Sequence, residues 1–122
     1  RNLPIETIER ANDAAQEHGY WFLRAINAGV KMALGSDRQP LHQTTLLEMG
    51  MWIKAGATPE KTILAATRNA AELCGFGDQL GTVESGKLAD LIVVGNNPLE
   101  QIESLRDLRL VLKEGVVIID NR

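Results

Sequence analysis

One aspartate, Asp37, stands where a carboxylate can do chemistry, because it follows a short apolar run and two small residues. A carboxylate in such a place can bind a cation or exchange protons with water. Gly35 lets the backbone turn tightly just before it. From spacing alone, the commoner arrangement is an aspartate that accepts hydrogen bonds from the next backbone N–H groups of the turn. Spacing by itself therefore favours the structural interpretation of Asp37.

Arg38 and His42 are the polar side chains closest to Asp37 that can recognise a ligand. Both fall in a polar stretch, residues 38–42, which we expect to be a loop. A guanidinium or an imidazole there can contact the carboxylate or carbonyl of a small substrate. The alternative for His42 is an ordinary histidine on a surface loop, and spacing alone favours that alternative.

Four other polar residues have simpler interpretations. His18 lies among polar residues of a helical segment, so we expect it on the solvated surface. Asn69 falls inside an apolar helical segment, where we expect it to fix local backbone. Lys87 and Asp90 are interpreted as residues of a turn and of the beginning of a strand.

The composition excludes several classes of protein. The chain has 122 residues, 44% of them hydrophobic and 24% charged, which is typical of a globular protein. Its net charge of −3, without a dense Lys/Arg cluster, argues against a nucleic-acid or anionic-membrane partner. No run reaches the ~18 apolar residues of a membrane span. The single cysteine, Cys74, can form no internal disulfide, and we expect it to be buried.

The pattern of apolar residues predicts an α/β organisation. Helical periodicity covers residues 5–27, with Gly19 as a point where the helix can bend, and a second helix is predicted over residues 44–55. Between them, residues 30–34 have the pattern of a buried strand. Thr58 and Pro59 are typical of a helix start, and this third helix is predicted to continue to Cys74.

The second half of the chain has the pattern of short strands and turns. Strand-like pieces are expected at residues 81–83, 89–94, 108–113 and 116–119, separated by glycine- and asparagine-rich turns. We therefore predict two parts, residues 1–77 and residues 78–122.

Three stretches of this sequence together resemble one protein family. They are AGVKMALGSD at residues 28–37, AGATPE at 55–60 with AATRNAA at 65–71, and LGTVESGKLADLIVV at 80–94. In this order they are similar to the C-terminal portion of metal-dependent hydrolases of the amidohydrolase superfamily. The residues of these stretches are most similar to those of the prolidase-like and imidazolonepropionase-like branch.

The resemblance implies a particular fold. Its members have a TIM (β/α)8 barrel and a small β-sandwich built from both ends of the chain, and such a barrel needs about 250 residues. We therefore expect this chain to hold the last barrel strand with its helices, followed by part of the sandwich. The HxH pair and the other metal-binding histidines of the family would precede this stretch.

The resemblance also implies a chemistry for Asp37. In similar enzymes this aspartate is a metal ligand and also accepts a proton from the metal-bound water. A divalent metal, expected to be zinc, lowers the pKa of that water from about 15.7 to about 7. The carboxylate then returns the proton to the leaving nitrogen of an amide, a Xaa-Pro dipeptide or a cyclic amide. Arg38 and His42 are the expected substrate-binding residues, and the resemblance outweighs the structural interpretation of Asp37.

Two alternatives stay open. A deaminase of the same superfamily would use Asp37 in the same way, and a non-catalytic structural or oligomerising module would not use it at all. One carboxylate does not hold a catalytic metal, so we expect the isolated chain to be inactive and metal-free. Unpaired strands and exposed apolar faces predict a homo-oligomer. We expect a cytoplasmic protein, with any targeting information upstream.

Overall fold

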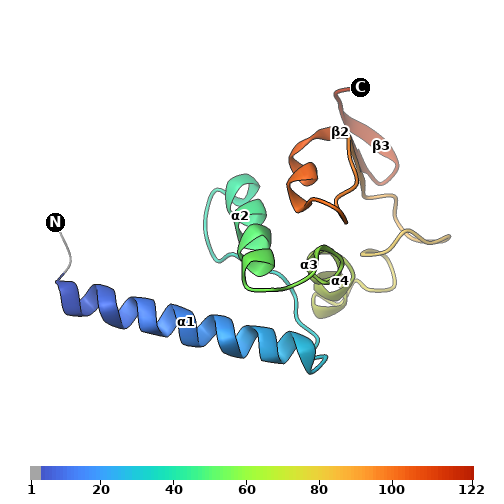
Figure 1. Ribbon diagram of the computed structural model, residues 1–122. Helices are drawn as coiled ribbons and strands as arrows, with labels where there is room; N and C mark the ends of the chain where they lie inside the picture. The colour runs from blue at the N-terminus through green and yellow to red at the C-terminus, as the bar shows by residue number, and fades with distance from the viewer. Residues whose placement is uncertain (1–3) are drawn as a thin grey trace. The chain divides into compact units, whose positions relative to one another are not determined.

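The computed structural model describes residues 4–122, apart from the side chain of His42. The chain divides into two compact units, the first ending at Val30 and the second being Lys31–Arg122. The first unit holds α1, and the second holds the other helices and all three strands (Figure 1). No helix among the described residues is both long and apolar enough to cross a membrane.

Helix α1, Ile5–Asn27, confirms the first predicted helix and runs through Gly19 without interruption. It ends where Gly29 adopts a φ of 76°. There the amide of Val30 donates to the carbonyl of Ala25 and the amide of Gly29 to that of Ile26. This pair of bonds is a Schellman cap, which satisfies carbonyls left unpaired at a helix end.

Helix α2, Leu41–Lys54, begins three residues earlier than predicted. The carbonyl of Pro40 accepts hydrogen bonds from the amides of Gln43 and Thr44, which closes the first turn ahead of the apolar stripe. The expectation that residues 38–42 are all loop is therefore wrong, and His42 belongs to the first turn of α2.

The third predicted helix is present but broken in two. The expected cap is confirmed, since the Thr58 hydroxyl accepts from the amide of Lys61 at 3.3 Å. Helix α3, Pro59–Ala66, then stops at Thr67, whose φ and ψ are −118° and −89°. Helix α4, Arg68–Leu73, follows directly.

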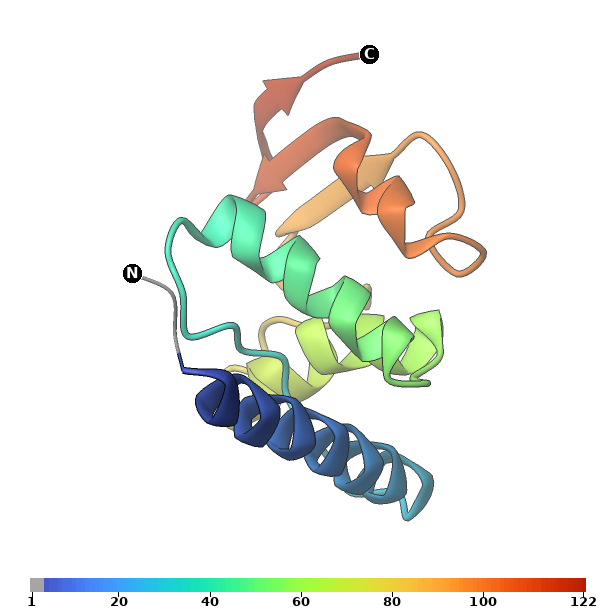
Figure 2. The ribbon, with the colours of Figure 1, turned by 60° about the vertical axis from the view of Figure 1, so that its left-hand side comes forward.

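The strands form one antiparallel sheet in the order β1-β2-β3. They are β1, Leu91–Val94, β2, Leu108–Lys113, and β3, Val116–Asp120, with the 3-10 helix η1, Ile102–Arg106, between β1 and β2. The predicted strands at 89–94, 108–113 and 116–119 are confirmed, whereas residues 81–83 form a loop. In both ribbon views α2–α4 gather on one side of this unit and the sheet on the other (Figures 1 and 2).

A small core holds the second unit together, where α2 packs against α3 and η1. Its buried residues are Met49, Trp52, Ala57, Thr62, Ala65 and Ile102. Cys74 is exposed, so the expectation of a buried cysteine is wrong. Helix α4 ends directly before it, and none of the six residues of this helix is buried, so the position that follows also lies at the surface.

Residues 30–34 do not form the predicted barrel strand. They lie outside every helix and strand, because a strand needs a hydrogen-bonded neighbour and no other strand runs beside them within residues 4–122. The amide of Leu34 donates instead to the carbonyl of Ala65 on α3, at 3.1 Å. This segment leads directly to Asp37.

Candidate active site around Asp37

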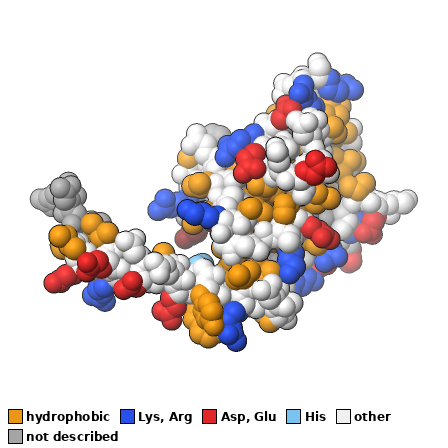
Figure 3. Space-filling view, in the orientation of Figure 1, with side chains coloured by type: hydrophobic (Ala, Val, Ile, Leu, Met, Phe, Trp, Pro, Cys, Tyr) orange, Lys and Arg blue, Asp and Glu red, His pale blue; other side chains and the backbone are white. Residues whose placement is uncertain are grey.

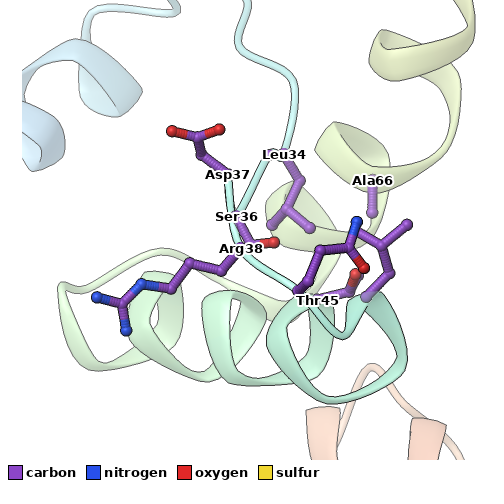
Figure 4. A pocket seen from close by; sticks show the side chains of 9 residues that line it. Leu34, Ser36, Asp37, Arg38, Thr45 and Ala66 are labelled. Atoms are coloured by element: carbon purple, nitrogen blue, oxygen red, sulfur yellow. The ribbon is translucent and has the colours of Figure 1, made fainter.

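Asp37 is an exposed residue at the end of the irregular segment that starts at Lys31. Its φ of 49° lies in the left-handed region, which aspartate tolerates better than most residues with a side chain. Figure 4 shows its carboxylate pointing away from Leu34 and Ala66. Among the described residues no backbone N–H donates to this carboxylate, so the turn-capping arrangement favoured by spacing alone is not the one formed.

One hydroxyl holds the backbone on both sides of Asp37. Ser36 Oγ donates to Thr44 Oγ1 at 3.1 Å, and Thr44 Oγ1 lies 2.9 Å from the Arg38 carbonyl and 3.2 Å from the Pro40 carbonyl. A hydroxyl has one proton, so it donates to one carbonyl at a time or shares the proton between them. Thr44 sits in the first turns of α2, and this link ties the turn to that helix.

The turn borders an open hollow of roughly 530 Å³. It is lined by Leu34, Gly35, Ser36, Asp37, Arg38, Gln39, Leu41, Thr45 and Ala66. Figure 4 shows the Arg38 side chain leaving the turn in a different direction from the Asp37 carboxylate. The structure thus brings Asp37 and Arg38 to one turn without pairing them, while the side chain of His42 lies outside the described residues.

Three polar contacts fasten the segment before Asp37 to α3 and α4. They are an ion pair between Lys31 and Glu72, a hydrogen bond of 2.8 Å from Asn69 Nδ2 to the Met32 carbonyl, and the Leu34–Ala65 bond. Sequence reasoning missed Thr44 and Ala65 in these roles. A threonine four residues after a proline at a helix start was the signal for Thr44; nothing in the sequence marks the Ala65 carbonyl.

The described residues do not by themselves fit a catalytic metal. No three His, Cys, Asp or Glu side chains among them come together in a group that could hold one. Asp37 supplies a single carboxylate, whereas a catalytic zinc takes about three protein ligands. Any further ligands would have to come from outside the described residues.

A second charged cluster, around Asp90, is structural. Lys113 Nζ donates to its Oδ2 at 2.5 Å, and the Glu114 amide donates to its Oδ1 at 2.7 Å. Both hydrogen bonds lower the pKa of Asp90 below its ordinary value, and the bond from Lys113 has the larger effect. Glu114 and Gly115 both have positive φ, 51° and 81°, as a two-residue hairpin turn requires. Asp90, directly before β1, therefore anchors the β2–β3 turn.

Lys87 fixes the loop that precedes this cluster. Its ammonium group donates to the Gly77 carbonyl at 2.7 Å and to Thr82 Oγ1 at 2.6 Å. The interpretation of Lys87 and Asp90 as turn and strand-start residues is confirmed, and neither belongs to the turn that carries Asp37.

Comparison with known proteins agrees with the motifs. The model described as the amidohydrolase family matches residues 1–118. Ochratoxinase from Aspergillus niger is 37% identical over 110 residues, covering 89% of this chain and 23% of that protein. Imidazolonepropionase from Thermoplasma volcanium is 30% identical over 101 residues, covering 78% of this chain and 25% of that protein.

Solved structures show the same relationship. The match to the crystal structure of A. niger ochratoxinase covers 98% of this chain and 28% of the ochratoxinase chain, with a TM-score of 0.87 and 32% identity. The match to the crystal structure of a Xaa-Pro dipeptidase with bound methionine covers 81% of this chain and 25% of the dipeptidase chain, with a TM-score of 0.74 and 40% identity. The chain spans about a quarter of the length of these relatives. It belongs to the amidohydrolase family, in the branch of imidazolonepropionase-like and prolidase-like proteins.

Proposed function

We propose that this chain carries one part of the active site of a metal-dependent amidohydrolase, with Asp37 as its catalytic carboxylate. The observation that carries the proposal is the exposed Asp37 carboxylate, which no described backbone group occupies, at the end of a segment fastened to three helices. The backbone around Asp37 is held by these hydrogen bonds, whereas its carboxylate is free to exchange a proton with water. This supports hydrolysis of a C–N bond.

The chemistry of Asp37 follows from its carboxylate. It accepts a proton from water as the water oxygen forms a bond to the substrate carbonyl carbon. The C–N bond then breaks, and the leaving nitrogen takes the proton from Asp37. A divalent metal, which we propose is zinc, needs ligands from outside the described residues, and the proposal assigns Asp37 as one of its ligands.

The substrate class is a small molecule with an amide, a Xaa-Pro dipeptide bond or a cyclic amide. Arg38 is exposed at the same turn, where its guanidinium can bind a substrate carboxylate in a bidentate manner. We assign His42 the same task from its place in the first turn of α2. The names of the relatives, ochratoxinase, imidazolonepropionase and Xaa-Pro dipeptidase, support this range of substrates.

We further propose that residues 1–77 belong to a TIM barrel and residues 78–122 to a β-sandwich. In that arrangement residues 30–34 would pair as the last barrel strand once their neighbours are present. Alone, the 122-residue chain is proposed to be inactive, to bind no metal and to self-associate. The exposed apolar residues of β3 support self-association; they are Val116, Val117, Ile118 and Ile119, and Figure 3 shows hydrophobic side chains in the region of this hairpin.

A chimeric enzyme tests the role of Asp37. The matching quarter of the Xaa-Pro dipeptidase is replaced by this chain, and hydrolysis of a Xaa-Pro dipeptide is measured with zinc present. We expect a hydrolytic chimera whose kcat falls by about 10²–10⁴-fold on Asp37→Asn, the range for removal of a general base. Asp78→Asn, at another exposed aspartate, is the matched control and should leave kcat unchanged.

Two outcomes would reject the proposal. One is a folded chimera that does not hydrolyse the dipeptide, and the other is an Asp37→Asn chimera with the unmodified rate. The isolated chain provides a separate check, because zinc-dependent turnover by its 122 residues alone would contradict the proposed incompleteness of the site.

A further inference from the structure

The break between α3 and α4 creates a binding site for the backbone that leads to Asp37. In a continuous helix the Ala65 carbonyl would accept from the amide four residues later. The helix is interrupted at Thr67, whose hydroxyl donates to the Ile63 carbonyl at 2.7 Å. The Ala65 carbonyl accepts from Leu34 instead. The break therefore leaves the Ala65 carbonyl free to accept a hydrogen bond from residues 31–34, which have no strand beside them among the described residues.

Asn69 adds a side-chain contact to the same segment. Its Nδ2 donates to the Met32 carbonyl at 2.8 Å, across 37 positions of sequence. Met32 and Leu34 are two residues apart, so their backbone polar groups point to the same side of the segment if it runs as a strand. The α3–α4 pair thus bonds both the Leu34 amide and the Met32 carbonyl.

The other end of the Asn69 amide shows what this side chain contributes. Its Oδ1 atom is buried without a hydrogen-bond partner in the described part of the chain. The contact of Asn69 with the segment is therefore the Nδ2 bond, which fixes the direction of the Met32 carbonyl.

The fixed segment lies immediately upstream of Asp37. Only Gly35 and Ser36 separate Leu34 from Asp37, and Ser36 is itself bonded to Thr44. We propose that Asn69 is a positioning residue, which holds the segment 31–36 against α4 and thereby sets the place of the Asp37 carboxylate. The inference rests on the proposed function only in naming Asp37 as the group that is positioned.

A measurement on the unmodified chain tests the contact directly. Labelling with ¹⁵N and ¹³C allows detection of the scalar coupling across a hydrogen bond, here between Asn69 Nδ2 and the Met32 carbonyl carbon. We expect this coupling in the folded chain. Its absence, with the rest of the amide spectrum that of a folded protein, would overturn the proposal.

A variant shows whether the contact holds the segment. Asn69→Asp keeps the shape of the side chain, but at pH 7 a carboxylate cannot donate to the Met32 carbonyl. We expect amide exchange across residues 31–38 to quicken roughly two- to tenfold, the factor for loss of one hydrogen bond. The amides of Met49 and Trp52 in α2, and all amides of the matched Asn96→Asp variant, should keep their rates. At acidic pH the neutral carboxyl can donate again, and the difference from the unmodified chain should narrow.

The outcomes separate this inference from the proposed function. Unchanged exchange at residues 31–38 in a folded Asn69→Asp chain would overturn the inference; if this variant unfolds throughout, the coupling in the unmodified chain decides. In the dipeptidase chimera we expect Asn69→Asp to lower kcat with little change in KM. If the coupling is present but Asp37→Asn leaves the rate of the chimera unchanged, only the proposed function is rejected.

Discussion

Replacement of Gly81 tests how the loop of residues 77–88 packs on the α3–α4 break. Gly81 has a φ of 92°, and a Cβ added there would lie 2.7 Å from the Cβ of Ala71 and 2.9 Å from the Cα of Arg68. Both atoms belong to α4, so they cannot move aside like the end of a flexible side chain. Gly86 is the matched control, because its φ is 89° and no heavy atom lies within 4 Å of the added Cβ.

The two glycines share one cost and differ in another. An alanine in the left-handed region costs about 1–2 kcal/mol, and the loss of unfolded-state entropy returns about 0.4–1 kcal/mol. Only Gly81→Ala adds an overpacking cost of about 1–3 kcal/mol. We therefore expect the free energy of unfolding to fall by about 1 kcal/mol in Gly86→Ala and by about 2–4 kcal/mol in Gly81→Ala.

Urea unfolding followed by circular dichroism measures both values. If only folded-state packing changes, the slope of the free energy of unfolding against urea concentration stays the same and the midpoint of unfolding shifts. Equal losses in the two variants would refute the reasoning, because the contact with α4 would then contribute nothing.

Two further predictions concern the sheet. Hydrogen bonds lower the pKa of folded Asp90, so its ionised form stabilises the chain above about pH 4, and this contribution is lost as the pH falls through the lowered value. Asp90→Asn should therefore lower the urea midpoint at pH 7, with a difference from the unmodified chain that shrinks in acid; a difference independent of pH would contradict this. A charge on an exposed edge strand opposes pairing with another chain, so Ile118→Lys in β3 should shift the sedimentation of the chain toward monomer. An unchanged oligomer would show that β3 is not the interface.

Helix ends were the most predictable part of the fold. Gly29, Gly56 and Gly75 each follow an apolar periodic stretch, and each adopts a positive φ just after a helix. Thr58 and Pro59 mark the start of α3 for an equally local reason. These signals depend on a few neighbouring residues, so the sequence alone reveals them.

What escaped prediction depends on residues far apart in the chain. The break at Thr67 and the bond from Asn69 to Met32 both belong to the docking of residues 31–34 on α3 and α4. The strand pattern of residues 30–34 was recognised, but pairing requires a neighbour that no local pattern provides. The prominence of Asp37 came from its motif, whereas Thr44, which holds its turn, is separated from it by a loop and part of a helix.

Chemical rescue of Asp37 tests most directly whether its carboxylate carries the proton. Asp37→Gly removes the carboxylate without strain, since glycine accepts a φ of 49° readily. In the dipeptidase chimera this variant should lose about 10²–10⁴-fold in kcat, and added formate should restore part of the rate in proportion to its concentration. Asp37→Gly with the full rate and no formate would contradict the assignment.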